Sequence, residues 1–172
     1  MVKPILEGVL VWAALSFVLN LAWEVMQLPL YTIAESGTAS QLAYAVLHCT
    51  LGDVIIASGS FVLAGFLLHA PDWPSSRPWP GMAVASVSGL LYTAYSEWSN
   101  VYVAGTWAYS AAMSLVFGIG LAPLLQWIVV PMLSLAIIRS RRWRIWPRPA
   151  MSRESPKAWR TQPGRPMEGP PR

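Results

Sequence analysis

Charged side chains are scarce in this 172-residue sequence, where Asp, Glu, Lys and Arg together make up 12% of the residues. An ordinary soluble domain has roughly a quarter of its residues charged, and 55% of this chain is hydrophobic. The composition therefore excludes an ordinary water-soluble domain. Basic residues are almost missing from the first 138 positions, because ten of the twelve Lys and Arg lie in residues 139–172. The net charge of +4 thus reflects the C-terminal segment and not the body of the protein.

Cysteine and the common cofactor motifs are also lacking. The single Cys49 excludes an intramolecular disulfide framework and a cysteine-based zinc module. The sequence contains no glycine-rich dinucleotide or phosphate loop, no GxSxG nucleophile elbow and no HExxH helix. No cofactor is indicated by sequence, and nucleic acid is not an expected partner.

Long apolar runs are present instead. A membrane-crossing helix needs about 20 largely apolar residues, and each of four segments supplies them: about 5–30, 42–69, 82–103 and 109–138. We therefore predict an all-α polytopic membrane protein, a four-helix transmembrane bundle occupying residues 1–138. The fourth segment is long and contains Gly118, Gly120, Pro123 and Pro131, which predicts a kink or a short entering segment before the crossing.

The C-terminal segment 139–172 has a different character. It is rich in arginine and contains seven prolines after residue 146, a composition that cannot build a core. We predict a disordered basic tail in the cytoplasm. Its first residues are expected to contact lipid headgroups, through Arg139, Arg141, Arg142 and Arg144.

The basic residues also predict the orientation of the chain. Lys and Arg concentrate on the cytoplasmic side of membrane proteins. With four spans, Lys3, Arg77 and the tail fall on one side, whereas the loops at 31–41 and 104–108 contain no Lys or Arg. We therefore expect a multi-pass protein of the plasma or inner membrane, with both termini in the cytoplasm.

Polar residues inside the first span follow one helical face. Asn20, Glu24 and Gln27 have the spacing i, i+4, i+7, with Ser16 one turn further inward and Trp23 beside them. This face is expected to point at protein and not at lipid. Because ionisable groups are costly in a bilayer, each one within a span is a functional candidate.

Two other spans carry ionisable residues at a matching depth. Glu24, His48 and Glu97 each lie about six residues from the outer end of their span, or roughly 9 Å below the surface. Asp53 lies deeper, about 140° around the helix from His48, and joins the site only if the helix is distorted or another helix intervenes. Glu97 ends a row of small residues, and Asn100 follows one turn later.

These residues define the expected site. Glu24, His48 and Glu97 are the predicted catalytic groups. The expected supporting residues are Asn20, Trp23, Gln27, Asp53 and Asn100. If a metal is bound, its expected ligands are Glu24, His48, Glu97 and Asp53. For the amides alone, a structural role as hydrogen bonds between helices is favoured, and it applies to Asn20, Gln27, Asn100 and Gln126.

Three classes of function fit such a site. The first is an acid–base enzyme, with or without a metal, that acts on a lipid or other amphiphile. The second is a protein that binds or transports protons or a small molecule. The third is an accessory subunit of a membrane complex. The expected partners are the lipid bilayer, a lipid or amphiphilic ligand, and either a second copy of the chain or another membrane protein.

Overall fold

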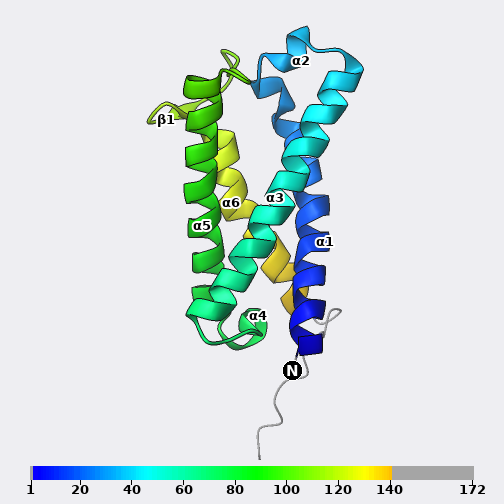
Figure 1. Ribbon diagram of the computed structural model, residues 1–172, viewed down its shortest axis with the longest axis vertical. Helices are drawn as coiled ribbons and strands as arrows, with labels where there is room; N and C mark the ends of the chain where they lie inside the picture. The colour runs from blue at the N-terminus through cyan, green and yellow to red at the C-terminus, as the bar shows by residue number, and fades with distance from the viewer. Residues whose placement is uncertain (1, 141–172) are drawn as a thin grey trace, which may run out of the picture.

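The computed structural model describes residues 2–140, with side chains from residue 6 onward, and this part of the chain is mostly helical (Figure 1). The long helices are α1 (Val2–Gln27), α3 (Ala39–Leu67), α5 (Pro78–Trp98) and α6 (Leu121–Arg139). Short elements connect them: η1 (Leu28–Leu30), α2 (Ile33–Ser36), α4 (Trp73–Ser76), the π-helix η2 (Ser99–Ala104), β1 (Leu115–Val116) and β2 (Ile119–Gly120). The predicted tail, from residue 141 onward, lies outside the described residues.

Within residues 2–140, three helical segments are long and apolar enough to cross a membrane. They are Leu6–Leu30, Ala39–Leu67 and Leu121–Arg139, with mean hydropathies of 1.8, 1.7 and 2.1. Many large apolar side chains on these helices are exposed, as expected for surfaces that face lipid and not water. The coarse prediction of a helical membrane protein is thereby supported.

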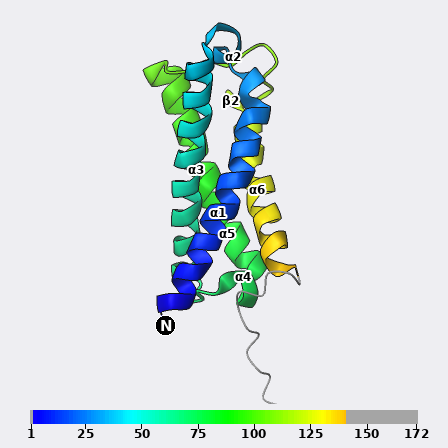
Figure 2. The same ribbon diagram turned by 90° about the vertical axis from the view of Figure 1, so that its right-hand side faces the viewer.

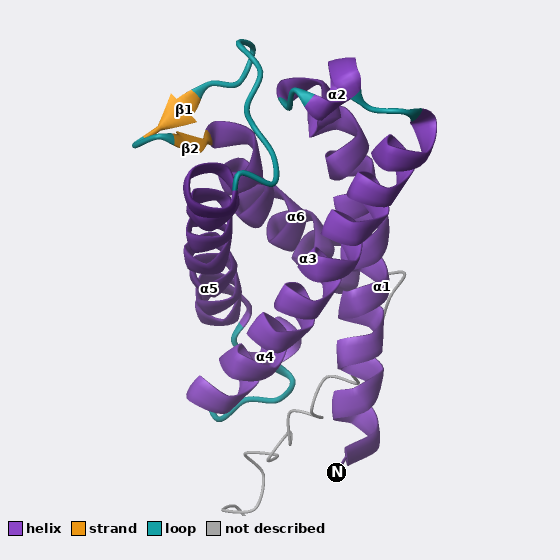
Figure 3. Cartoon of the chain, turned by 45° about the horizontal axis from the view of Figure 1, so that its top comes forward, coloured by secondary structure: helices purple, strands orange, loops and turns teal. Residues whose placement is uncertain are grey.

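The long helices run antiparallel to their neighbours in chain order (Figures 1 and 2). α1 packs on α3 and α6, and α5 packs on the same two helices. The chain enters α1 and leaves α6 at the end that carries α4, called here the α4 end. The opposite end carries α2 and the loops around η2 and is called the α2 end (Figure 3).

Local sequence signals explain where α3 and α5 begin. Thr38 caps α3 in a capping box with Gln41, whose side-chain Oε1 accepts from the Thr38 backbone N–H at 2.8 Å. This box starts the helix at Ala39, three residues before the predicted span. α5 begins at Pro78, because proline is tolerated in the first turn, where its missing N–H has no helical partner.

The fourth predicted span needs a correction, because residues 109–120 are not helical. They form a loop that contains the antiparallel pair β1 and β2 (Figure 3). Phe117 and Gly118 connect the two strands with φ angles of 51° and 83°, a left-handed conformation that ends any helix and that glycine adopts readily. The helix begins only at Leu121, so apolar composition alone overestimated this span by twelve residues.

The small residues of α5 allow close helix packing, as their row predicted. Gly81, Ala85 and Gly89 are buried. A methyl group added at Gly81 would lie 2.0 Å from the Trp73 ring, and one added at Gly89 would lie 1.9 Å from the Trp127 ring. The two indoles therefore occupy the space that the missing side chains leave. This packing fixes α5 against α4 and α6, and it places Glu97, further along the same row, inside the bundle.

Candidate functional site

The polar face of α1 is buried in the bundle, which confirms that it points at protein. Ser16, Asn20, Glu24 and Gln27 are all buried, and Glu24 is only 8% exposed. The Gln27 amide donates to Glu24 Oε1 at 2.8 Å, and the indole of Trp23 donates to Gln27 Oε1 at 3.1 Å. The Asn20 amide donates to the Ser16 hydroxyl at 2.9 Å. The face is thus a continuous hydrogen-bonded row that orients the Glu24 carboxyl group.

Gln126 of α6 links this row to α3. Its Nε2 lies 2.9 Å from Asn20 Oδ1, 3.2 Å from Glu24 Oε1 and 2.7 Å from Asp53 Oδ2. An amide nitrogen carries two protons, so three acceptors compete for two donors. Gln126 itself is only 2% exposed. Glu24 and Asp53 form a pair of neighbouring carboxyl groups held by one amide.

Glu97 of α5 is held separately, by two tyrosines from loops of the α2 end. The Tyr31 hydroxyl donates to Glu97 Oε1 at 3.2 Å, and the Tyr109 hydroxyl donates to Oε2 at 2.6 Å. Tyr109 is fixed in turn, because its oxygen accepts the backbone N–H of Gly120 at 3.0 Å. The Glu97 carboxyl group, 7% exposed, is therefore oriented by two phenols on opposite oxygens.

The two phenols remain protonated donors over the ordinary pH range. Burial, and next the nearby Glu97 charge, raises the pKa of Tyr31 well above its usual value. Burial, and next the hydrogen bond to Glu97, raises the pKa of Tyr109 in the same direction. Neither hydroxyl is a base near neutral pH, so both stabilise whatever negative charge Glu97 carries.

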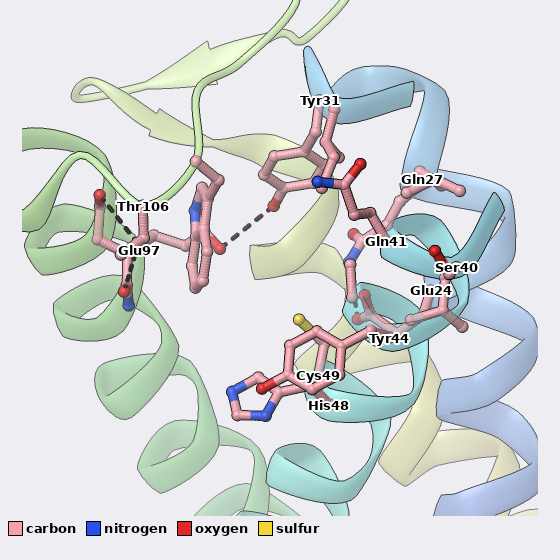
Figure 4. A pocket seen from close by; sticks show the side chains of 16 residues that line it. Glu24, Gln27, Tyr31, Ser40, Gln41, Tyr44, His48, Cys49, Glu97 and Thr106 are labelled. Carbon is pink, nitrogen blue, oxygen red and sulfur yellow. Dashed lines mark hydrogen bonds between the residues drawn. The ribbon is translucent and has the colours of Figure 1, made fainter. Parts of the chain in front are cut away.

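Two adjoining cavities open beside these carboxyl groups. The first, of about 500 Å³, lies toward the α2 end, and the second, of about 650 Å³, runs between α3 and α5. Their shared lining joins them into one space, and it consists of Glu24, His48, Cys49, Glu97, Asn100 and Trp107. Figure 4 shows the first cavity, with Glu97 on one wall and Glu24 on the other. Asp53 and Gln126 line the second cavity.

His48 is less enclosed than Glu24 and Glu97, the two residues predicted to share its site. It lines both cavities, but its side chain is exposed and stacks on Tyr44, with ring centroids 5.5 Å apart. Within residues 6–140 it forms no hydrogen bond with Glu24 or Glu97. Matching depth placed the three residues at one level, but depth does not determine which way a side chain points. Asp53 was expected to join the site only if the helix is distorted or another helix intervenes, and the second condition is met, because Gln126 of α6 lies between Asp53 and Glu24.

The remaining predicted residues have local roles. Asn100 donates to the Ser96 carbonyl at 2.8 Å and accepts from the Thr106 hydroxyl at 2.7 Å, so it orders the end of α5 and does not bind Glu97 directly. Arg139, expected at lipid headgroups, donates to the Pro74 carbonyl at 3.2 Å. The other three arginines of that prediction lie outside the described residues.

The suggested metal ligands are not brought together. Among the described residues, no group of three or more His, Cys, Asp or Glu side chains could hold a metal ion. The reason is geometric: Glu24 and Asp53 lie together beside Gln126, Glu97 lies on another helix and is bound by two tyrosines, and the ring of His48 stacks on Tyr44. The described residues give no support to a metal centre built from this set.

Sequence reasoning missed the tyrosines and gave Gln126 only a structural role. Tyrosine is common at membrane boundaries, so the sequence positions of Tyr31 and Tyr109 indicate interfacial aromatics and not partners of a carboxylate. The sequence signal for their role was their position, because both tyrosines lie at the predicted outer boundary of the membrane, close to the expected depth of Glu24 and Glu97. Gln126 had the clearer signal, because it is the only strongly polar side chain of α6 before Ser134.

The hydrogen-bonded network ends inside the bundle. Next to Ser16, on the side toward the α4 end, lies a small void of about 10 Å³. Its lining includes Ser16, Ser134 and Trp12. Beyond it the α4 end is closed by packed rings, with Trp12, Phe61 and Trp73 in mutual contact at centroid distances of 5.2 to 5.6 Å. The polar space is therefore reached from the α2 end and from between α3 and α5, but not from the α4 end.

Comparison with known proteins adds no functional information. No protein-family model, no curated protein and no solved structure matches this chain. The geometry of the site must therefore support any functional proposal.

Proposed function

We propose that the chain crosses the membrane four times, with α5 as the third crossing. α5 has 21 residues, which corresponds to about 31 Å of helix rise, close to the thickness of the hydrocarbon layer. Its large outward side chains are apolar or aromatic and exposed, as in Val87, Leu91 and Tyr95. Its lower hydropathy comes from the polar and small residues that face the bundle, which lipid does not contact.

In the proposed arrangement the membrane is the plasma or inner membrane and both termini lie in the cytoplasm. Arg77 and Arg139 lie at the α4 end, where the chain also begins and leaves the bundle (Figure 1). The connections of the α2 end contain no Lys or Arg. The positive-inside tendency therefore favours the α4 end as cytoplasmic and the carboxyl groups as lying toward the outer leaflet.

The proposed activity is acid–base catalysis on a lipid or another amphiphile. The observation that carries it is that the Glu24–Asp53 pair and Glu97, from separate helices, line one continuous space. Neighbouring carboxyl groups that share one proton can donate it, while a second carboxylate accepts a proton from another position of the same molecule. Such an exchange changes the position of a proton without oxidation or reduction.

Transport of a proton or a small molecule is the second candidate. The buried polar row of α1 favours it, because such rows serve as proton relays in membrane proteins. A transporter also needs access from both sides, whereas the aromatic rings of Trp12, Phe61 and Trp73 close the α4 end. An enzyme needs only the one-sided entry that the cavities provide. A role as an accessory subunit would not require a cavity at all.

Solvent-deuterium incorporation tests the proposal directly. Purified protein in its co-purifying lipids, supplemented with a total lipid extract, is incubated in D2O, and the lipids are analysed by mass spectrometry. We expect one lipid class to gain non-exchangeable deuterium, with the rate reduced roughly 100-fold or more in Glu97→Gln or Asp53→Asn. Glu35→Gln, at an exposed carboxylate of α2, is the matched control and should retain full activity.

Two results would overturn the proposal. One is the absence of protein-dependent deuterium incorporation in any lipid class. The other is an activity that Glu97→Gln and Asp53→Asn leave intact while both variants remain folded by circular dichroism.

A further inference from the structure

The second cavity has the shape of a groove between α3 and α5. On α3 it is lined by residues that follow one face, from Gly52 and Asp53 past Ile55, Ile56, Gly59 and Ser60 to Leu63. Asp53 and Leu63 are ten positions apart, which corresponds to about 15 Å along the helix. On α5 the facing wall runs from Glu97 back to Ser88. The groove therefore starts at the carboxyl groups and leads away from them along the helices.

Two glycines leave this groove open. A methyl group added at Gly52 or Gly59 would meet no atom within 4 Å. The glycines of α5 differ sharply, because a methyl group at Gly81 or Gly89 would overlap a tryptophan ring. Glycine is an unfavourable residue inside a helix unless a close approach or open space requires it. At Gly81 and Gly89 of α5 it serves packing, whereas at Gly52 and Gly59 of α3 it preserves empty volume.

The groove is open toward the lipid side of the bundle. Its border consists of large side chains that also face outward: Ile55 is 73% exposed, Leu63 40% and Tyr92 53%. A hydrocarbon chain can therefore pass between α3 and α5 without entering water.

The polar end of the groove favours a cation. Glu24, Asp53 and Glu97 line the space, and the only Lys or Arg side chains within residues 6–140 are Arg77 and Arg139. Both of these lie at the α4 end of the bundle, remote from the carboxyl groups. A cationic partner stabilises ionised carboxylates in a low-dielectric site. A ligand with a positive head group would supply that partner.

We propose that the cavity binds a single-chain cationic amphiphile, with its amine head at the three carboxyl groups and its tail in the groove between α3 and α5. This inference rests on the proposed function in naming the substrate class of the same site. The apolar side chains of the α3 wall, Ile55, Ile56 and Leu63, contact the chain, the carboxyl groups recognise the head, and the open border lets the molecule enter from the bilayer.

Alkyl probes of defined head and length test this inference. Binding of dodecylamine, dodecanol, dodecanoate and butylamine is measured by intrinsic tryptophan fluorescence on the full-length protein in detergent, below the self-association limit of each probe. We expect dodecylamine to bind roughly tenfold or more tightly than dodecanol and dodecanoate, because only the amine pairs with the carboxylates.

A groove-filling substitution separates the tail from the head. Gly59→Leu should weaken dodecylamine binding about tenfold by occupying the groove, and it should leave butylamine binding unchanged. Ala43→Leu, at an exposed position of α3 outside both cavities, is the control of similar bulk. Gly52→Leu provides a second groove variant if Gly59→Leu does not fold.

Each outcome bears on a different proposal. Equal binding of dodecanoate would refute the cationic head, and full dodecylamine affinity in both folded groove variants would refute the tail groove. Tight, groove-dependent binding of dodecylamine without deuterium incorporation would refute catalysis and leave the binding site standing.

Discussion

Gln126 is the residue on which the polar network depends most. It is the only described side chain that bonds to α1 and α3 at once, through Asn20, Glu24 and Asp53. Removing its amide leaves buried acceptors without a donor, which costs more than a hydrogen bond between exposed groups. Substitutions of Gln126 and of its partners on α1 or α3 should therefore have non-additive effects on the free energy of unfolding.

A double-mutant cycle measures this coupling. We expect Gln126→Met to lower the free energy of unfolding by about 1–3 kcal/mol. Combined with Asp53→Leu, it should give an interaction energy of at least about 0.5 kcal/mol, since the two residues share one hydrogen bond. Denaturant unfolding in detergent provides the measurement. The control pair Gln126→Met and Gln41→Met should be additive, and additivity in both cycles would contradict the shared network.

Tyr31 and Tyr109 give a prediction about alkaline pH. Their pKa values are raised in the folded protein, so above pH of about 10 the unfolded chain loses phenol protons that the folded protein retains. The contribution of these groups to stability is complete below pH 10 and is lost as pH rises further. We expect Tyr31→Phe to reduce the decline in the free energy of unfolding between pH 9 and 11. An identical decline in wild type and variant would contradict the role assigned to burial.

The site was only partly predictable from single residues. The spacing of Asn20, Glu24 and Gln27 was sufficient to predict a buried polar face, because helical periodicity fixes which side chains share a face. The partner of Asp53 was not predictable, since it comes from α6, and the packing order of helices is not encoded in the local pattern.

At the scale of elements, the indole of Trp127 on α6 fills the space beside Gly89 and packs α6 against α5. Gly89→Ala places a methyl group 1.9 Å from Trp127, so one helix must move. We expect a loss of about 1–3 kcal/mol in the free energy of unfolding. Gly52→Ala is the matched control, because open space surrounds that position and alanine is the better helix former. An equal effect of both substitutions would show that packing against Trp127 is unimportant.

Helix boundaries were predictable where local chemistry decides them. The small row of α5 and the break at Gly105 follow directly from sequence, and Gly105 adopts a φ of 63° at the end of η2. The stretch 109–120 was mispredicted because its apolar residues form a loop and strand pair over the bundle end. Hydropathy cannot separate an apolar loop from the first turns of a span.

At the scale of the molecule, the number of crossings determines where the two ends of the chain lie. Crossing by α1, α3 and α6 alone would leave the termini on opposite sides, whereas a crossing by α5 returns them to the same side. The antiparallel order of all four long helices favours the second arrangement (Figure 1). The depth of the carboxyl groups below the outer surface depends on the same choice.

Paired reporter fusions at the helix connections distinguish these arrangements. We expect fusions after Arg77 and after Arg139 to activate a cytoplasmic reporter, and fusions after Gly37 and after Gly105 to activate a periplasmic one, because basic residues favour the cytoplasmic side. The decisive pair is Arg77 and Gly105, which flank α5. Cytoplasmic activity at both points would show that α5 stays on one side, and Glu97 would then be unable to face Glu24 across a cavity within the bilayer.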